Sequence, residues 1–98
     1  MPKLTRTRLA EIDLLEIWEF IAQDSPLAAN KIIRDLDARS QELLVHPRLG
    51  LSRKDVAPNM RQLVMDNYLI LYRIINSNND VEIVRLLHGA RDLFSLFE

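Results

Sequence analysis

The sequence of 98 residues contains no cysteine, only two glycines and no apolar run near the ~20 residues that a membrane span needs. The lack of cysteine excludes disulfides and thiolate metal sites. The N-terminus has no uncharged apolar segment typical of a secretory signal, so we expect a cytoplasmic protein with no membrane partner. Lys and Arg number 13 against 14 Asp and Glu, for a net charge of −1. That balance argues against a protein that functions mainly by binding nucleic acid, because affinity for phosphates comes from a surplus of Lys and Arg.

The residues that are present indicate one globular domain spanning 1–98. Hydrophobic residues make up 48% and charged residues 28%, which is typical of a folded chain with a single core. The patterning predicts an α+β fold, a helical hairpin packed on a small antiparallel sheet in the order β-α-α-β-β-β. The expected elements are a short edge strand or frayed terminus at 3–7, helices at 8–24 and 26–46, and strands at 60–65, 68–75 and 81–88.

The two predicted helices differ in how cleanly their apolar residues line one face. The second has a single stripe and begins at Ser25-Pro26, a serine cap followed by a proline suited to the first turn. The first carries additional apolar residues, Leu9, Ile12 and Phe20, on its charged side. They either pack under other parts of the chain, which we prefer because single exposed apolar residues are common, or form a patch for a partner. His46, before Pro47, is interpreted as a cap of the second helix rather than as a catalytic residue.

The three-stranded meander is predicted from a hairpin at Asp66-Asn67. A two-residue turn pairs Met65 with Tyr68, Leu63 with Ile70 and Arg61 with Tyr72. Alternation then gives one apolar face toward the helices, which Val84 and Leu86 extend. The second face is semi-apolar and holds Gln62, Val64, Leu69, Leu71, Arg73, Ile83, Arg85 and Leu87. Its arginines suit planar recognition of carboxylate or phosphate.

Motifs for cofactor, metal or hydrolytic chemistry are missing. There is no Gly-rich phosphate loop, no Gly-x-Ser-x-Gly and no His-Glu-x-x-His, so we expect no cofactor and no metal site. The acids of the first helix, Glu11, Asp13, Glu16 and Glu19, look like a solvated face. One candidate for RNA cleavage remains, in which His88 and Arg91 converge with Arg73 and Arg85. A purely structural role for His88 and Arg91 at the strand end is at least as well supported.

Four segments together resemble the ParE branch of the RelE/ParE toxin superfamily. They are Glu16 to Ala22 (EIWEFIA), His46 to Gly50 (HPRLG), Asn67 to Ile74 (NYLILYRI) and Leu86 to Asp92 (LLHGARD). The resemblance follows their order through nearly the whole chain. It implies the toxin of a type II toxin-antitoxin system, bound in a hetero-oligomer by a ParD-like antitoxin. Sequence-specific nucleic-acid binding would then occur only through the antitoxin.

The resemblance also implies a choice of target, because RelE-type relatives cut mRNA on the ribosome and ParE-type relatives poison DNA gyrase without being enzymes. RelE-type ribonucleases use lysines on the first meander strand, an arginine after the tyrosine that opens the next strand, an arginine after the glycine turn and a tyrosine in the tail. The corresponding positions here hold Met60 and Gln62, Leu69, Arg91 and Phe97. Only the arginine of the turn is kept, so we predict a gyrase-poisoning toxin that is not an enzyme.

Two alternatives stay open: a ribosome-dependent ribonuclease using His88 and Arg91 as catalytic residues, and a non-toxic relative that only binds antitoxin. For the target we predict contacts from the basic loop and the sheet end: Arg53, Lys54, Arg61, His88 and Arg91. For the antitoxin we predict the second sheet face and the helix patch: Leu69, Leu71, Arg73, Ile83, Arg85, Leu9, Ile12 and Phe20.

Overall fold

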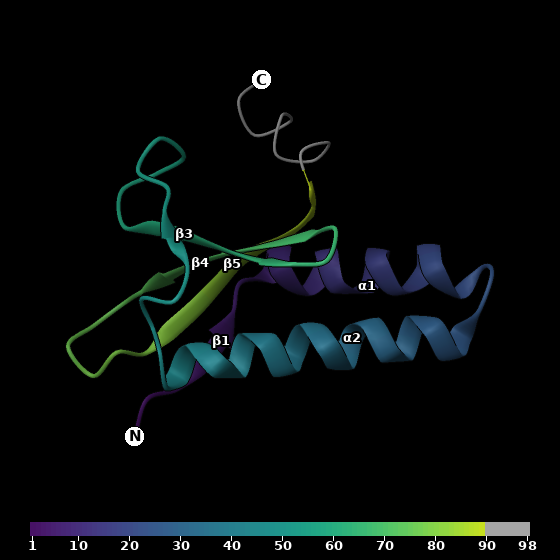
Figure 1. Ribbon diagram of the computed structural model, residues 1–98, viewed down its shortest axis with the longest axis horizontal. Helices are drawn as coiled ribbons and strands as arrows, with labels where there is room; N and C mark the ends of the chain where they lie inside the picture. Colours follow the sequence, from purple (N-terminus) through teal and green to yellow (C-terminus); the bar gives the residue numbers. More distant parts are fainter. Residues whose placement is uncertain (90–98) are drawn as a thin grey trace.

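A computed structural model describes residues 1–89 and has two helices against one face of a five-stranded sheet (Figure 1). In chain order the elements are β1 (Leu4–Arg6), α1 (Arg8–Ala22), α2 (Pro26–Gln41), the 3₁₀ turn η1 (Glu42–Leu44), β2 (Leu51–Ser52), β3 (Met60–Met65), β4 (Tyr68–Ile74) and β5 (Val81–His88). The helices lie side by side, and the loop that joins them projects beyond the sheet. The predicted α+β class and helical hairpin are confirmed.

Hydroxyl caps set the starts of both helices. The backbone N–H of Ala10 donates to Thr7 Oγ1 at 3.1 Å, and that of Ala28 donates to Ser25 Oγ at 3.1 Å. These bonds satisfy N–H groups that have no partner within the helix. At the end of η1 the backbone N–H of His46 donates to the carbonyl of Glu42. The predicted stripe of the second helix is confirmed, with Ala29, Leu36 and Ser40 of α2 and Leu43 of η1 buried.

The hairpin between β3 and β4 has the predicted register. Met65 pairs with Tyr68, Leu63 with Ile70 and Arg61 with Tyr72. Asp66 in the turn has a φ of 52°, a left-handed conformation that tight hairpin turns require and that Asp tolerates better than most residues. The local sequence signal was therefore sufficient for this part of the sheet.

A bulge in β5 corrects the predicted faces of the last strand. Leu71 pairs with Arg85 but Tyr72 pairs with Ile83, which leaves Val84 as the extra residue. One inserted residue reverses the period-two alternation on one side of it. Ile83 consequently packs in the core with the helices, and Val84 packs with Leu71 on the other face. The predicted faces of Ile83 and Val84 were wrong.

Two strands extend the predicted meander into a mixed sheet in the order β1-β5-β4-β3-β2. The expected N-terminal edge strand forms, and it runs parallel to β5, with Leu4 beside Val81 and Arg6 beside Ile83. β2 adds a short antiparallel edge next to β3. Because β1 ends at Arg6, no strand among residues 1–89 neighbours the outer edge of β5 beyond Ile83.

Candidate functional site

The predicted target-binding residues lie in two separate places. Arg53 and Lys54 belong to the loop before β3, and Arg61 lies on β3 opposite Tyr72 of β4. His88 lies opposite Tyr68 at the other end of β4. Tyr68 and Tyr72 are four positions apart on β4, which is about 13 Å along the strand at ~3.3 Å per residue. Arg91 lies outside the described residues.

Arg53 is bound within its own loop. Its guanidinium contacts the Asp55 carboxylate through two nitrogens, at 2.9 Å and 2.8 Å, and its third nitrogen donates to Gln62. The hydrogen bond from Arg53 lowers the pKa of Asp55. Arg53 therefore shapes the loop and offers little free charge to a partner.

Tyr72 fixes the segment that leads into this loop. Its ring is fully buried; its hydroxyl donates to the carbonyl of Pro47 at 2.7 Å and accepts from the N–H of Gly50 at 2.9 Å. Burial raises the pKa of this hydroxyl. A Cβ atom on Gly50 would lie 2.4 Å from the carbonyl oxygen of Gln62 and 2.7 Å from the Tyr72 ring. Only glycine fits here, so one tyrosine and one glycine hold the connection from α2 to the sheet.

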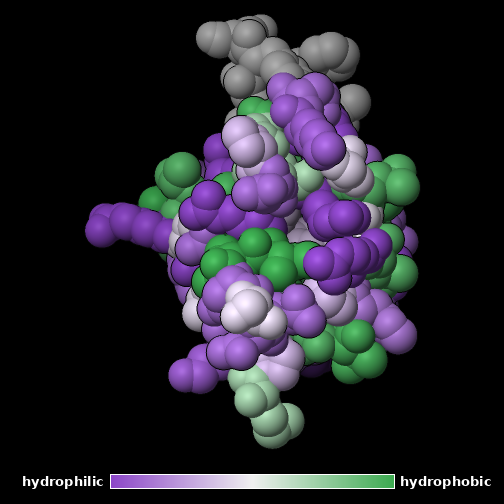
Figure 2. All heavy atoms as spheres, turned by 90° about the vertical axis from the view of Figure 1, so that its left-hand side faces the viewer, coloured by the Kyte–Doolittle hydropathy of each residue, from purple (hydrophilic) through white to green (hydrophobic). Residues whose placement is uncertain are grey.

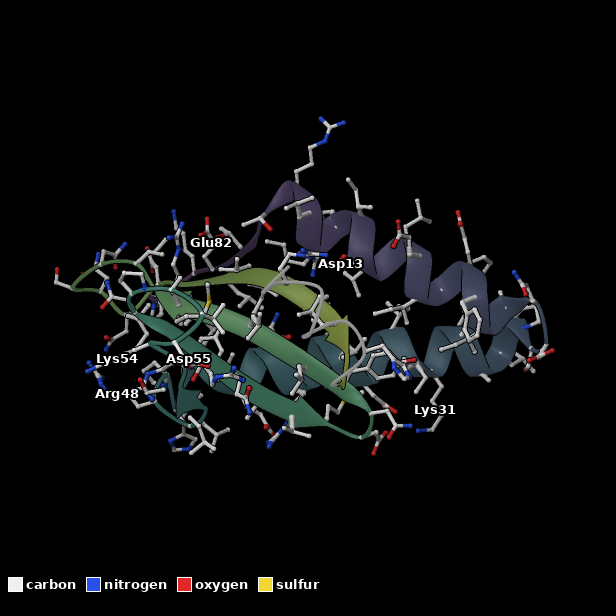
Figure 3. The ribbon with its side chains drawn as sticks, turned by 90° about the horizontal axis from the view of Figure 1, so that it is seen from above. Asp13, Lys31, Arg48, Lys54, Asp55 and Glu82 are labelled. Atoms are coloured by element: carbon white, nitrogen blue, oxygen red, sulfur yellow. The ribbon has the colours of Figure 1, made fainter. Side chains whose placement is uncertain are left out.

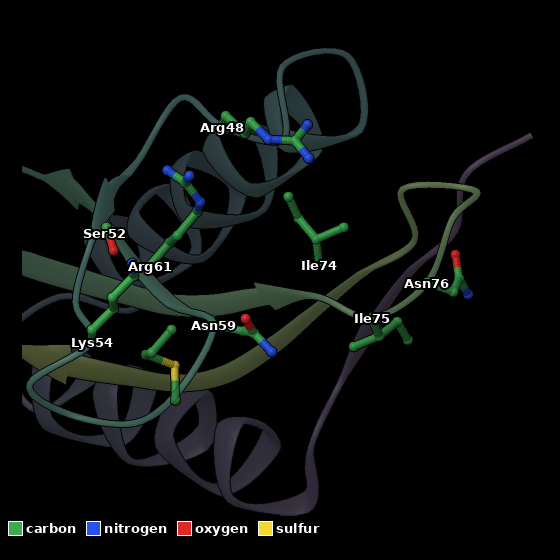
Figure 4. A pocket seen from close by; sticks show the side chains of 9 residues that line it. Arg48, Ser52, Lys54, Asn59, Arg61, Ile74, Ile75 and Asn76 are labelled. Carbon is green, nitrogen blue, oxygen red and sulfur yellow. The ribbon is translucent and has the colours of Figure 1, made fainter.

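Beside this connection lies a hollow of about 400 Å³ with three cationic side chains around it (Figure 4). The cations are Arg48, Lys54 and Arg61, and the other lining residues are Ser52, Asn59, Met60, Ile74, Ile75 and Asn76. Arg61 Nη1 donates to the carbonyl of Gly50 at 2.7 Å. Arg48 was missing from the predicted target-binding set, although its place in the cluster of loop cations is visible in the sequence.

The three α1 residues assigned to the antitoxin are on the surface. Leu9, Ile12 and Phe20 are 55%, 40% and 71% exposed. The preferred interpretation, that the sheet or the N-terminal strand covers them, was wrong. Antitoxin binding at these residues stays a prediction.

The sheet residues assigned to the antitoxin are mostly buried or bound to other residues of the chain. Leu69, Leu71 and Ile83 are at most 8% exposed. Ile83 faces the helices because of the bulge, so its assignment to the open face no longer holds. Arg73 pairs with Glu82 at 2.7 Å and remains half-exposed.

Asp13 of α1 has a partner that the sequence analysis missed. It is 7% exposed, and its carboxylate accepts two hydrogen bonds from Arg85, at 2.8 Å and 3.1 Å. It also accepts from the backbone N–H of Leu86 at 2.9 Å, on the outer edge of β5 that β1 leaves open. The expectation of a solvated face was therefore wrong for Asp13, because this carboxylate ties α1 to β5. In Figure 3 Asp13 lies between α1 and the sheet.

His88 lies at the opposite end of the β4–β5 pair from Arg73. Its ring packs edge-on against Tyr68, with ring centroids 5.6 Å apart. It borders a hollow of about 320 Å³ between α1 and the sheet, lined also by Asp13, Glu16, Ile17, Phe20 and Leu86. Arg73 forms an ion pair with Glu82, and Arg85 forms one with Asp13. Among residues 1–89 the lining of this hollow includes acids and no lysine or arginine. Arg73 lies opposite Glu82, toward the other end of β5, so its expected convergence with His88 was wrong. Arg85 binds Asp13 of this same lining, and its convergence with His88 stays a prediction.

Among residues 1–89, no group of three or more His, Asp or Glu side chains is placed to hold a metal ion. No helix in that part of the chain is long and apolar enough to cross a membrane.

Comparisons with known proteins agree with this architecture. Toxin ParE3 of Caulobacter vibrioides is 28% identical over 94 residues, 95% of this chain and 92% of that protein. Toxin RelE2 of the same organism is 33% identical over 91 residues, 93% of this chain and 99% of that protein. A solved structure titled as the chromosomal ParDE toxin-antitoxin system from P. aeruginosa shares the fold, with a TM-score of 0.76 at 23% identity, over 91% of this chain and 97% of that one. Residues 4–93 match the family described as the ParE toxin of the type II toxin-antitoxin system parDE, and the chain belongs to that family.

Proposed function

We propose that this toxin poisons DNA gyrase, is not itself an enzyme and is neutralised in the cytoplasm by a ParD-like antitoxin. The observation that carries the proposal is the environment at the positions where the resemblance places ribonuclease cations. Met60 and Leu69 are 7% and 8% exposed and pack in one apolar cluster. Gln62 accepts a hydrogen bond from Arg53. A buried apolar cluster cannot stabilise the charge that develops when RNA is cleaved.

The ParE family membership and the ParE3 relative support the gyrase target over the ribosome. The charge balance supports it as well, because a net charge of −1 gives little attraction to a ribosome covered in phosphates. The toxin acts in this proposal by binding, and the antitoxin acts by covering the binding surface. The exposed α1 residues Leu9, Ile12 and Phe20 and the half-exposed Arg73 are the described positions best placed to meet the antitoxin.

The test uses purified toxin at concentrations that match those at which its expression stops growth. We expect loss of gyrase supercoiling and accumulation of cleaved DNA linked to gyrase, both reversed by the antitoxin. Unchanged supercoiling and unchanged cleaved DNA at those concentrations would reject the proposal.

The similarity to toxin RelE2 favours a second candidate, a ribosome-dependent ribonuclease using His88 and Arg91. Mapping of mRNA ends after induction separates the two functions. Site-specific cuts that disappear in His88→Ala would establish the ribonuclease. Normal growth on induction, with antitoxin binding retained, would instead identify a non-toxic relative.

A further inference from the structure

The hollow beside β3 has a lining that fits an anion. Its polar side chains are the three cations together with Ser52, Asn59 and Asn76, and none of its lining residues is an acid. Ser52 and Asn59 can donate hydrogen bonds, whereas the amide of Asn76 already donates to Asp80. Figure 2 shows this end of the molecule, where hydrophilic residues surround a small patch of hydrophobic residues. The hollow thus combines positive charge with hydrogen-bond donors.

The charge in this hollow is not neutralised inside the described chain. Arg48 and Lys54 form no ion pair within residues 1–89, whereas Arg53, Arg73 and Arg85 each do. Arg61 is held in place by the carbonyl of Gly50, whose N–H is bound by the buried Tyr72. Like charges gathered without acids oppose folding slightly, and an anionic partner removes that repulsion on binding. Arg61 is thus held in place, and the positive charges of Arg48 and Lys54 are not paired with an acid among the described residues.

We propose that this hollow binds the phosphodiester backbone of the DNA that gyrase holds, through Arg48, Lys54 and Arg61. The inference deepens the proposed gyrase function and rests on it. Arg, Lys, Ser and Asn side chains are the groups that contact DNA phosphates without reading sequence. The net charge of −1 keeps the affinity for free DNA low, so the contact becomes strong only where gyrase presents the DNA. The toxin thereby recognises enzyme and DNA together.

The first experiment measures the hollow directly. Isotope-labelled toxin is titrated with a short DNA duplex at low salt while its NMR signals are followed. We expect shifts at Arg48, Lys54 and Arg61, and a weaker affinity in Arg48→Gln and in Lys54→Gln. Each lost phosphate contact on the duplex should reduce the slope of log affinity against log salt by about 0.9. Arg8→Gln is the matched control, because Arg8 is an exposed cation on α1 with no ion pair among the described residues. Lys31→Gln is a second control, far from Arg48 and Lys54 in Figure 3, although Lys31 pairs with Asp35.

These variants should keep their fold. Arg48 and Lys54 are exposed and have no ion pair among the described residues, so replacing either by Gln removes only repulsion. We expect thermal midpoints no lower than that of the parent protein. If one Gln variant has a lower midpoint, the other carries the comparison. Arg48→Lys and Lys54→Arg keep the charge and should keep DNA binding.

The second experiment uses gyrase and tests whether the ligand of the hollow is DNA or a protein. Arg48→Gln and Lys54→Gln should reduce toxin-dependent cleaved DNA and leave toxin binding to gyrase without DNA unchanged. Equal loss of binding to DNA-free gyrase would identify a protein carboxylate as the ligand and overturn the inference. A parent toxin with no effect on gyrase rejects the proposed function. In that case the NMR titration still tests whether the hollow binds DNA. The absence of duplex-induced shifts at its residues would overturn the inference.

Discussion

Replacing Asp13 by Ala should destabilise the free toxin more than any other change of an acid on α1. The substitution removes the carboxylate that accepts from the Arg85 guanidinium and from the Leu86 N–H. Breaking a buried ion pair removes about 3 to 5 kcal/mol. Since the Arg85 side chain is 27% exposed, water restores part of its hydration, and we expect a loss of about 2 to 3 kcal/mol. Asp13→Asn keeps an acceptor for Leu86 and should lose about 1 to 2 kcal/mol.

Urea unfolding followed by circular dichroism measures these losses. The slope against urea should stay constant while the midpoint falls. In a thermal scan the Ala variant should melt roughly 10 to 20 °C lower, at about 4 to 8 °C per kcal/mol for a domain of this size. Glu19→Ala is the matched control, an exposed acid on the same helix. A loss for Asp13→Ala no larger than that for Glu19→Ala would refute the assignment of this carboxylate as the tie between α1 and β5.

Three further changes test other contacts. Tyr72→Phe should lose about 1 to 3 kcal/mol, because the N–H of Gly50 and the carbonyl of Pro47 lose their partner. Burial raises the pKa of Tyr72 above its ordinary value of 10.0, so the protonated hydroxyl stabilises the fold below pH 10.0 and this stabilisation is lost as the pH rises above it. In urea titrations at alkaline pH, the free energy of unfolding should therefore fall more for the parent protein than for Tyr72→Phe. Gly50→Ala should lose about 3 kcal/mol through its clash with Gln62, and a change under about 0.5 kcal/mol would show that the backbone yields there. Thr7→Ala removes the cap of α1 and a bond to the Val84 carbonyl, so its thermal midpoint should fall while Thr5→Ala, on β1, stays near the parent.

The sequence predicted those parts of the fold that local signals determine. Ser25-Pro26 marked the start of α2, and Asp66-Asn67 fixed the register of β3 against β4. The bulge at Val84 was beyond prediction, because it depends on how β5 fits both β4 and β1. β2 has only two residues, too few for a periodic pattern.

The site was predicted less completely, because it depends on contacts between distant residues. Asp13 looked like one more acid on a charged helix face, and only the fold brings it to Arg85. Arg48 and Lys54 were visible as unbalanced loop cations, yet the hollow that unites them with Arg61 needs the end of β4. Arg53 looked equivalent to them until the structure showed it bound to Asp55.

The central claim is that the toxin acts on gyrase, and the amount of plasmid DNA cleaved and covalently held by purified gyrase tests it most directly. Cleaved DNA should rise with toxin concentration, and antitoxin in equal amount should return it to the level without toxin. A level that stays constant over the whole range of toxin concentration, from a preparation that binds antitoxin, would contradict the account.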